Sequence, residues 1–534
     1  MTVEKRTVGV FVAVILLYSV LILRLYALSE TPGLVAVARE QSSYTLQVSQ
    51  TRGGIYDRNF TRLTDTAEEN WLAVLPSDRS IQAVARQVTG PARQQVLSQM
   101  QGQRPFLAPV GGQKVYGADV ENITRRARYA GPILAPHLLG YLDGEGKGVS
   151  GIEAAYDGLL SRAGEEMTLT YRVDGLGQAM EDRPQTQGSD ALPPEGVVLT
   201  LDREMQQVVE RATEGIEKGA AVVLDVQTGE ILAAVSRPDF DPREVAASLE
   251  DPDAPLYNRV FSAFNVGSTF KLAVAAAALE QGVSPEFSVE CVGAAQVDGR
   301  IFYCSNRAGH QHTDLLRAIE QSCNPYFIAL GQEVGGENIL AMARALGFGQ
   351  GVELAPGMTA AAGSLPDRSQ IASLQGLANF SFGQGSLTAT PLQIAAMVST
   401  FANGGMAVTP TLVRGTTSDG KTLEPVEPLA ARRVLSEETA AHIRECMIGV
   451  VTEGSGTPGN PSAGGAGGKT ASAQTGIWED GEEIVHAWFA GFFPAQQPRY
   501  AAVVLVEGGE YGGKIASPIF KQIADGVLLA ESNK

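Results

Sequence analysis

The chain opens on an apolar stretch, from Val8 to Leu28, in which Arg24 is the only charged residue. As a helix, these 21 residues would span roughly 31 Å, about the thickness of the hydrocarbon core of a bilayer. Two basic residues precede the stretch, which is typical of a cytoplasmic flank. We therefore expect a single-pass transmembrane helix over 8–28, a cytoplasmic tail over 1–7, and an extracytoplasmic position for the rest of the chain.

The same stretch has two other interpretations. A cleaved signal peptide would also begin this way, with Ala27-Leu28-Ser29 as a small-residue cleavage site. A buried core helix is the third interpretation, although such a helix is not expected to open a chain beside a polar tail. A membrane anchor and a signal peptide both export everything after residue 30.

Residues 30–190 are polar, rich in glycine and mixed in pattern. The spacing predicts helices over Ile81–Met100 and Asp119–Arg128, among loops and strands. Gln185–Pro194 (QTQGSDALPP) has the turn-forming composition of a linker. We therefore expect a mixed α/β N-terminal domain, acting as a pedestal, over 30–190, and a second domain over 195–534.

The second domain has a regular pattern. Apolar spacing predicts helices over Arg203–Lys218, Ser268–Gln281, Asp314–Gly331, Glu337–Leu346, Pro391–Asn403, Ser436–Val451 and Pro518–Ala530. Apolar β-type runs predict strands over Ala220–Leu224, Glu230–Val235, Val485–Phe493 and Tyr500–Val506, and the first two read as a hairpin. This order of elements predicts an α+β fold, with helices packed on an antiparallel sheet.

Composition narrows the possible functions. The 534 residues are enough for two to four domains, and 44% hydrophobic with 19% charged residues is typical of a folded protein. With 59 acidic and 41 basic residues the formal charge is −18. We therefore expect no nucleic-acid partner, because phosphate binding needs a dense positive surface and no Lys/Arg-rich run is present.

A serine and a lysine three residues apart, Ser268 and Lys271, open an alanine-rich helix. At this spacing they share one helix face, so the hydroxyl and the amine can approach each other. The positive end of the helix dipole favours an alkoxide and a neutral amine there. A serine nucleophile with a lysine base requires these properties. The alternative is a capping serine beside a surface lysine, because so short a motif also occurs by chance.

Two later motifs could complete such a site. Ser322–Asn324 (SCN) lies at a helix break, where a hydroxyl could relay a proton and an amide could hold a peptide carbonyl; an N-cap pair is the alternative. Lys469–Ser472 (KTAS) begins an extended stretch that could bind a carboxylate and offer backbone N–H groups to an oxyanion. A nucleotide-binding G-x-x-x-x-G-K-[ST] loop is excluded, because Ala463 occupies its first glycine position.

The order S-x-x-K, S-x-N, K-T-x-[ST] resembles that of penicillin-binding transpeptidases and serine β-lactamases. Arg52–Asn59 (RGGIYDRN) resembles the R-G-x-I-x-D-R-N motif of class B, or monofunctional, penicillin-binding proteins. Further stretches are similar to motifs of that family: His137–Tyr141, Ser150–Glu153, Asn379–Gly385, Thr390–Gln393 and Trp488–Phe492. The resemblance covers about residues 8–534.

This resemblance implies a membrane-anchored peptidoglycan D,D-transpeptidase. It would cross-link stem peptides through a serine acyl-enzyme, release D-alanine and be inhibited covalently by β-lactams, with no cofactor required. The implied catalytic residues are the nucleophile Ser268, its base Lys271, the proton relay Ser322 and the orienting Asn324; the implied substrate-binding residues are Lys469, Thr470 and Ser472. Implied partners are a polytopic glycosyltransferase and proteins of a division or elongation complex.

The chain departs from the family pattern at three positions. Ala471 replaces the usual third-position glycine of the K-T-G motif and is expected to narrow the substrate groove. Val266 stands where a proline often precedes the Gly-Ser pair, and Phe60 where the R-G-x-I-x-D-R-N motif is usually followed by glycine. Neither of these two is expected to touch the chemistry.

Cys291, Cys304 and His310 could hold a structural zinc ion, because two thiolates and an imidazole are zinc ligands. A fourth ligand could be Asp298, His312 or Asp314. A Cys291–Cys304 disulfide, natural in an exported protein, and two free thiols are the alternatives. The remaining cysteines are expected to pack, Cys323 beside the active site and Cys446 in the core.

Two other functions are compatible with these motifs. Hydrolysis, as in a D,D-carboxypeptidase or a class D-like β-lactamase, would use water instead of an amine, but such enzymes usually lack a long N-terminal module. A non-catalytic β-lactam sensor or scaffold would not need all of the motifs that are present. The sequence does not choose among division, elongation and sporulation as the process served.

Overall fold

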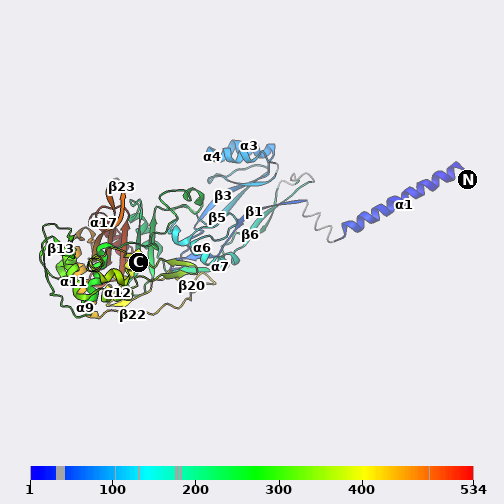
Figure 1. The fold of residues 1–534 in the computed structure, drawn as a ribbon. Helices are drawn as coiled ribbons and strands as arrows, with labels where there is room; N and C mark the ends of the chain where they lie inside the picture. The colour runs from blue at the N-terminus through cyan, green and yellow to red at the C-terminus, as the bar shows by residue number, and fades with distance from the viewer. Residues whose placement is uncertain are drawn as a thin grey trace. The chain divides into compact units, whose positions relative to one another are not determined.

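The computed structural model describes residues 2–31, 42–102, 104–129, 131, 133–174, 180, 183–479 and 481–532. The apolar N-terminal stretch forms helix α1 (Val3–Ser29), which is longer than the predicted 8–28 and has no buried residue (Figure 1). Within these ranges α1 is the one helix long and apolar enough to cross a membrane, with a mean hydropathy of 2.6. Its full exposure contradicts the core-helix interpretation.

The chain divides into two compact units and passes between them more than once. The first contains Met1–Arg52, Asp65–Ala130 and Gly164–Pro193; the second contains Gly53–Thr64, Gly131–Ala163 and Pro194–Lys534. The stretch predicted as an N-terminal domain over 30–190 is therefore shared, because two of its segments pack within the second unit.

The second unit is built on a five-stranded antiparallel sheet. Its strand order is β10 (Ile231–Arg237), β9 (Gly219–Asp225), β25 (Tyr500–Val506), β24 (Glu482–Phe493) and β23 (Gly467–Glu479). β9 and β10 form the predicted hairpin, and β25 pairs with β9 although more than half of the domain separates them in sequence. The fold class predicted from the sequence, an antiparallel sheet flanked by helices, is confirmed.

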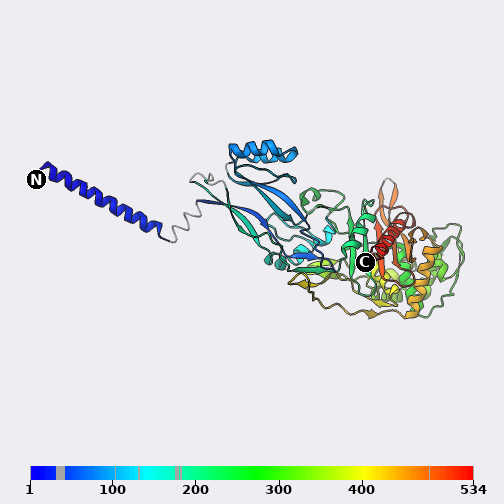
Figure 2. The same ribbon diagram turned by 180° about the vertical axis from the view of Figure 1, so that it is seen from behind.

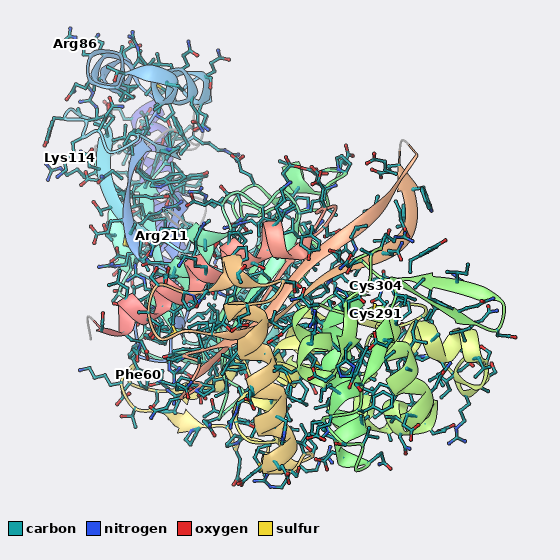
Figure 3. All side chains as sticks on the ribbon, turned by 90° about the vertical axis from the view of Figure 1, so that its left-hand side faces the viewer. Phe60, Arg86, Lys114, Arg211, Cys291 and Cys304 are labelled. Carbon is teal, nitrogen blue, oxygen red and sulfur yellow. The ribbon has the colours of Figure 1, made fainter. Side chains whose placement is uncertain are left out.

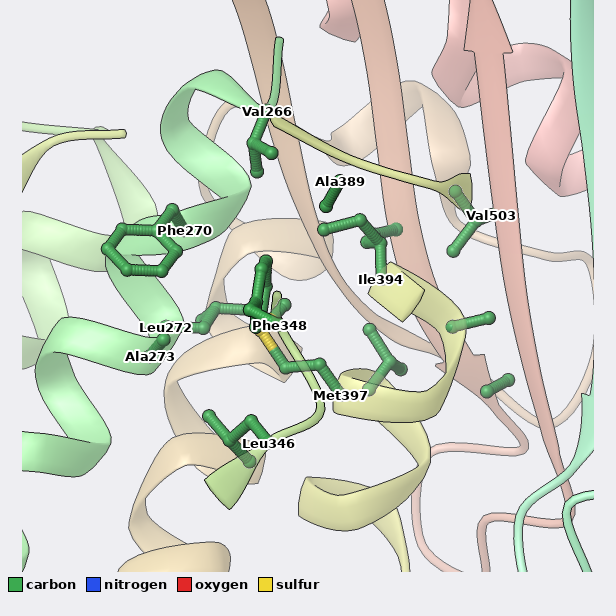
Figure 4. Close-up of a cluster of buried hydrophobic side chains, with 14 of the residues drawn as sticks. Val266, Phe270, Leu272, Ala273, Leu346, Phe348, Ala389, Ile394, Met397 and Val503 are labelled. Atoms are coloured by element: carbon green, nitrogen blue, oxygen red, sulfur yellow. The ribbon is translucent and has the colours of Figure 1, made fainter. Parts of the chain in front are cut away.

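Helices cover both faces of this sheet. Alternate residues of β9 face opposite ways: Ala221 and Val223 pack with α8 (Arg203–Ala212) and α17 (Gly512–Ser532), and Figure 2 shows α17 in red against the strands. On the other face Val222 joins a large core with α9 (Lys271–Glu280), α15 (Pro391–Ala402) and α16 (Glu437–Thr452). Figure 4 shows part of this core around Phe270. The period of two along the strand therefore divides the interior into two layers.

Several helices of the second unit, on both faces of the sheet, differ in detail from the predicted ranges. The predicted helix Asp314–Gly331 is two helices, α10 (Leu315–Glu320) and α11 (Asn324–Val334), and α12 (Gly336–Ala345) follows. Asp314 caps α10, and the break between the helices carries Ser322 in the left-handed region at φ 57°. α8 ends at Ala212, six residues before its predicted end, while α17 begins six residues before its predicted start.

Shorter elements complete the second unit. They are β2 (Gly54–Tyr56), α5 (Pro136–Leu139), α6 (Gly151–Ala155), α7 (Asp157–Arg162), β8 (Gly196–Leu199), η1 (Val245–Ser248), β11 (Phe264–Asn265), η2 (Gly267–Phe270), β12 (Val289–Cys291), β13 (Ala294–Val297), β14 (Arg300–Tyr303), β15 (Gln311–Thr313), β16 (Val352–Ala355), β17 (Met358–Ala360), α13 (Arg368–Ala372), α14 (Leu374–Ser381), β18 (Thr388–Ala389), β19 (Met406–Ala407), β20 (Val413–Thr417), β21 (Glu424–Pro425), β22 (Arg432–Arg433) and η3 (Thr457–Gly459).

Besides α1, the described residues of the first unit form two three-stranded sheets and two helices. One sheet has the order β4 (Phe106–Pro109), β3 (Ala67–Val74), β5 (Val120–Ala127), and the other β1 (Ser43–Gln50), β6 (Glu166–Arg172), β7 (Gln185–Gly188). The helices are α3 (Asp78–Gln87) and α4 (Gly90–Gln99). The sequence predicted one helix over Ile81–Met100, but the chain breaks between α3 and α4, where Gly90 adopts a φ of 68° and Pro91 follows.

One other prediction in this region is wrong. The predicted helix Asp119–Arg128 is strand β5, which pairs in register with β3 over its full length. Its β-branched residues suit a strand, and long-range pairing overrides a weak helical pattern. Asp119 itself lies at φ 66°, accepts both guanidinium N–H groups of Arg79 and does not start a helix. The predicted linker Gln185–Pro194 begins as the exposed edge strand β7.

The motif Arg52–Asn59 has a structural role within the second unit. Asp57 accepts the backbone N–H of Arg203 at the start of α8, at 3.2 Å. Arg58 and Arg414 both pair with Glu230, at 2.9 Å and 2.8 Å. The motif thus fastens residues 53–64 to the main sheet.

Phe60, labelled in Figure 3, lies just after this motif and adopts a φ of 62°. An L-residue rarely adopts this backbone region, whereas glycine adopts it freely. This explains why glycine is usual here in the family that the sequence resembles. Phe60 is an unusual residue for this backbone conformation, and it has no part in the proposed chemistry.

Candidate active site

The candidate nucleophile lies on a tight turn at the start of α9. Ser268 belongs to the 3₁₀ turn η2, which runs directly into α9. Gly267 adopts a φ of 61°, and a Cβ on it would lie 3.0 Å from the side chain of Ala473. The turn therefore requires glycine at this position and brings Ser268 close to strand β23.

Lys271 occupies the first turn of α9 and is fully buried. Its Nζ donates to the backbone oxygen of Ser322 at 2.8 Å, to the Ser322 hydroxyl at 3.2 Å and to Asn324 Oδ1 at 2.7 Å. In the part of the chain that the structure describes, it forms no hydrogen bond with the Ser268 hydroxyl, which lines the cleft one helical turn earlier. Lys271 thus ties the nucleophile helix to the second motif.

Ser322 lies between two lysines. Its hydroxyl accepts from Lys469 Nζ at 2.9 Å and from Lys271 Nζ at 3.2 Å. The strained left-handed backbone at Ser322 directs this side chain, and strain of this kind is common at functional sites. Asn324 opens α11 and donates through Nδ2 to the backbone oxygen of Tyr303 at 2.9 Å.

Strand β23 supplies the third motif. Lys469 is fully buried and also donates to the Thr470 backbone oxygen at 3.0 Å. Thr470 Oγ1 shares a 2.8 Å hydrogen bond with Ser455, and Ser472 Oγ accepts from the backbone N–H of Gly512 at 3.3 Å. The structure therefore brings all seven residues of the three predicted motifs to one place.

Burial changes the proton affinity of both lysines. Desolvation lowers the pKa of Lys271 to about 8, because a charged amine is unfavourable in a dry interior. Desolvation, and then repulsion from Lys271, lowers the pKa of Lys469 well below its usual range. A lysine with a pKa near 8 can accept a proton at physiological pH, as a general base must.

A cleft of about 420 Å³ opens over these residues. The lining includes Ser268, Ser322, Asn324, Thr470 and Ser472. A substrate in the cleft would meet the nucleophile, the hydroxyl between the lysines and the hydroxyls of β23.

Ala471 contributes a buried methyl group, 3% exposed, to the floor of the cleft. An ideal Cβ built on Gly267 would lie 3.3 Å from this methyl, so Ala471 packs beneath the nucleophile turn. The methyl group is thus directed at the turn that carries Ser268.

Trp488 is a positioning residue that the sequence analysis did not single out beyond its motif. It pairs with Ala471 across β23 and β24, and its Nε1 donates to the backbone oxygen of Asn265 at 3.0 Å. Asn265 lies three residues before Ser268, so the indole holds the chain that leads into the nucleophile turn. Only the long-range register of the sheet reveals this contact.

Four side chains gather behind the second motif: Cys291, Cys304, His310 and Cys323. All are buried, and their ligand atoms lie within 4.8 Å of one another. His310 Nδ1 is 3.7 Å from Cys291 Sγ and 3.5 Å from Cys304 Sγ. Figure 3 shows Cys291 and Cys304 next to each other. The cysteines are free, so the Cys291–Cys304 disulfide is not formed in this structure.

The fourth side chain of this cluster is Cys323, and not one of the three residues expected from the sequence. Asp314 caps α10, His312 is exposed beside Glu290, and Asp298 is exposed at a hairpin turn. None of them reaches the cluster, whereas Cys323, expected only to pack, does. The sequence does contain all four residues of the cluster, in the order C-x₁₂-C-x₅-H-x₁₂-C. Cys446 is buried on α16, as expected for a core residue.

The family comparison agrees with this geometry. Residues 219–525 match the family model described as the penicillin binding protein transpeptidase domain. Stage V sporulation protein D of Bacillus subtilis is 30% identical, over 98% of this chain and 85% of that protein. The peptidoglycan D,D-transpeptidase PbpA of Mycolicibacterium smegmatis is 30% identical, over 73% of this chain and 80% of that protein.

A solved structure shows the same fold. Penicillin-binding protein 3 of Mycobacterium tuberculosis, complexed with aztreonam, superimposes with a TM-score of 0.65 at 26% identity, covering 92% of this chain and 97% of that one. The family match, the relatives and the shared fold together confirm the resemblance stated from the three motifs. The chain therefore belongs to the penicillin-binding protein transpeptidase family, as a class B penicillin-binding protein.

Proposed function

We propose that this protein cross-links peptidoglycan stem peptides as a serine-type D,D-transpeptidase, with Ser268 as the nucleophile. The family membership supports the reaction, and the site supports the assignment of residues. The observation that carries the assignment is the Ser322 hydroxyl, hydrogen-bonded to both buried lysines at 3.2 Å and 2.9 Å. A hydroxyl between two amines can pass a proton to a leaving group without leaving its position.

In the acylation step, Ser268 Oγ attacks the carbonyl carbon of the penultimate D-alanine, and neutral Lys271 accepts the hydroxyl proton. The backbone N–H groups of Ser268 and Ser472 would stabilise the oxyanion. The peptide C–N bond then breaks. The terminal D-alanine departs as an amine and receives its proton through Ser322. The donor peptide remains bound to Ser268 as an ester.

In the second step, the amine of an acceptor stem attacks this ester and returns a proton to Ser268 by the reverse route. The substrate carboxylate would lie against Lys469 and Thr470. Since an opposite charge favours the protonated form of an amine, binding of the carboxylate raises the pKa of Lys469. A charged Lys469 then disfavours a second positive charge on Lys271, which keeps the base neutral when substrate is bound.

Labelling by a fluorescent penicillin tests the nucleophile. Wild type and Ser284→Ala, which removes an exposed serine in the loop after α9, should be labelled equally. Ser268→Ala should not be labelled, while its circular dichroism and melting temperature stay close to those of wild type. A folded wild-type protein without label, or a folded and labelled Ser268→Ala variant, would show that the assignment is wrong.

We also propose that Cys291, Cys304, His310 and Cys323 hold a structural zinc ion. A tetrahedral ion with Zn–S near 2.3 Å and Zn–N near 2.0–2.1 Å separates sulfur from nitrogen by about 3.6 Å. The two S···N distances are 3.5 Å and 3.7 Å, as such an ion would require. A hydrogen bond from Cys323 lowers the pKa of Cys304, which favours its thiolate, the form that binds zinc. Zinc would link the segment that carries Cys291, Cys304 and His310 to the second catalytic motif, because Cys323 lies between Ser322 and Asn324.

Metal analysis tests this site independently of activity. The purified full-length protein should contain one zinc per chain, and a cobalt-substituted sample should show the visible absorption of a tetrahedral thiolate site. Cys304→Ser should lose the metal, whereas the control Cys446→Ser, on α16, should retain it. Metal-free wild type with two fewer titratable thiols would favour the Cys291–Cys304 disulfide instead.

We propose a single-pass topology in which α1 anchors the protein and the parts of both units that follow α1 lie outside the cytoplasm. The length and exposure of α1 support this, as does the lipid-linked origin of the substrate. A reporter that is active only after export should function at the C-terminus and not at the N-terminus. An N-terminal sequence of the mature protein that begins near Ser29 would indicate a cleaved signal peptide instead.

A class B enzyme carries no glycan polymerase of its own, so we propose that a polytopic glycosyltransferase and division or elongation proteins associate with this chain. The exposed apolar surface of α1 is the proposed contact. Replacing α1 with an unrelated membrane helix should abolish co-purification of the polymerase while leaving penicillin labelling intact. Retained co-purification would assign the contact to another part of the chain.

A further inference from the structure

The charge of the cleft is opposite to that of the chain. The protein has 59 acidic and 41 basic residues, yet among the described residues the cleft is lined by two arginines, Arg300 and Arg307, and by no aspartate or glutamate. Lys271 and Lys469 lie behind the same cleft. In a cleft with walls of low dielectric, one sign of charge attracts ligands of the other. The composition of the cleft therefore indicates an anionic ligand.

Both arginines belong to residues 292–309, which we call the arginine arm. The Arg307 guanidinium lies 3.7 Å above the ring of Tyr303, and that of Arg300 lies 5.1 Å from the ring of Phe302. Stacking uses the flat face of a guanidinium and leaves its edge N–H groups free to donate in the plane. These edges suit the two oxygens of a carboxylate.

Neither arginine is already neutralised within the described residues. Neither forms an ion pair with a carboxylate there, in contrast to Arg259, which pairs with Glu507. Asp298 lies two residues before Arg300 but does not line the cleft, and its backbone oxygen accepts from Gln375. Two unpaired cations on a rim of the active-site cleft can bind a substrate anion without breaking an internal ion pair.

The arginine arm is also held in place. It begins after Cys291 and ends before His310, so the cluster of three cysteines and His310 closes its base. The Tyr303 backbone oxygen accepts from Asn324, which ties the arm to the second catalytic motif. A Cβ on Gly293 would lie 2.1 Å from the Arg307 backbone oxygen, so the two sides of the arm pack closely. The backbone that carries the two exposed arginines is therefore tied to the second catalytic motif.

We propose that Arg300 and Arg307 form a second carboxylate subsite. It would recognise a stem peptide that carries a free carboxylate upstream of its terminal D-alanyl-D-alanine, and discriminate against stems in which that carboxylate is amidated. The terminal carboxylate is assigned to Lys469 and Thr470, so the second carboxylate is a separate determinant. This proposal rests on the transpeptidase function proposed above and names the substrate class of the same site.

The test uses two synthetic donors that end in D-alanyl-D-alanine and differ only at an upstream residue, carboxylate in one and carboxamide in the other. Released D-alanine gives kcat and KM for each. Wild type should use the carboxylate donor with a kcat/KM about three- to tenfold higher, mainly through a lower KM, as expected for binding by an exposed charge pair. Arg300→Gln and Arg307→Gln should each reduce this preference, and the double variant should abolish it.

Two controls separate the possible failures. Arg211→Gln removes an arginine on α8 outside the cleft (Figure 3) and should keep the full preference. Labelling by a fluorescent penicillin should be the same in all variants, because it reports the nucleophile and a folded site. If wild type is labelled but uses both donors equally, or if the double variant keeps the preference, the subsite proposal is wrong and the transpeptidase function stands. If wild type is not labelled, the proposed function itself has failed.

Discussion

The pH dependence of acylation follows from the environment of Lys271. Burial lowers the pKa of this amine to about 8, and its neutral form is the proposed base. A lowered lysine pKa means that the base becomes available as pH rises: about a tenth of the molecules carry the neutral amine at pH 7 and about nine tenths at pH 9. The second-order rate constant for acylation by a penicillin should therefore rise about tenfold over this interval and then level off.

Asn324→Asp perturbs this equilibrium in a known direction. Asn324 Oδ1 lies 2.7 Å from Lys271 Nζ, so the substitution places a carboxylate in contact with the amine. An opposite charge at this distance raises a pKa by about 1–3 units. The midpoint of the acylation profile should move to about 9–11, and the rate constant at pH 7.5 should fall about tenfold or more, with recovery at high pH.

Stopped-flow measurement with a fluorescent penicillin between pH 6 and 10.5 checks both results. The control Asn338→Asp adds the same charge on α12, outside the cleft, where the Asn338 amide donates to the Val334 backbone oxygen at the end of α11. It should keep the wild-type midpoint. A wild-type profile that is flat between pH 7 and 9 would refute the assignment of Lys271 as the base. So would an Asn324→Asp profile with an unchanged midpoint.

Three further predictions concern the parts that hold the site. Gly267→Ala should destabilise the protein by about 1–3 kcal/mol and slow penicillin labelling, because φ is 61° and the new methyl would meet Ala473 at 3.0 Å; urea unfolding and labelling measure both. Trp488→Phe should cost about 1–3 kcal/mol, because the backbone oxygen of the half-buried Asn265 loses its donor at 3.0 Å; an unchanged urea midpoint would contradict this role. Removing zinc with a strong chelator should lower the melting temperature and penicillin labelling together, and adding zinc back should restore both. If labelling is unaffected by full metal loss, zinc has no role in holding Ser322.

Local patterns predicted the parts of the fold that depend on local interactions. The helix that opens at Ser268 and the hairpin around Gly229 were visible from spacing and turn residues, and the structure contains both. Asp119–Arg128 was predicted as a helix and is a strand, because pairing with β3 decides its conformation. A pattern of apolar residues contains no information about which distant strand will lie beside it.

In the active site, too, the sequence predicted the local motifs but not the contacts between distant segments. The three motifs named the chemistry, but the position of the Ser322 hydroxyl between Lys271 and Lys469 depends on segments 51 and 147 residues away in sequence. The place of Cys323 in the cluster with Cys291, Cys304 and His310 was missed, because a cysteine inside a catalytic motif also fits simple packing. The arginine arm was not predicted at all, since only the folded hairpin brings its two guanidinium groups to the cleft.

The central claim is that Ser268 forms an acyl-enzyme that is transferred to an amine. The most direct test supplies the full-length protein with nascent, uncross-linked glycan and analyses the muropeptides by mass spectrometry. The account predicts cross-linked dimers and free D-alanine from wild type and neither product from Ser268→Ala. Tetrapeptide monomers without dimers would show hydrolysis instead of transfer, and dimers formed by the Ser268→Ala variant would contradict the account altogether.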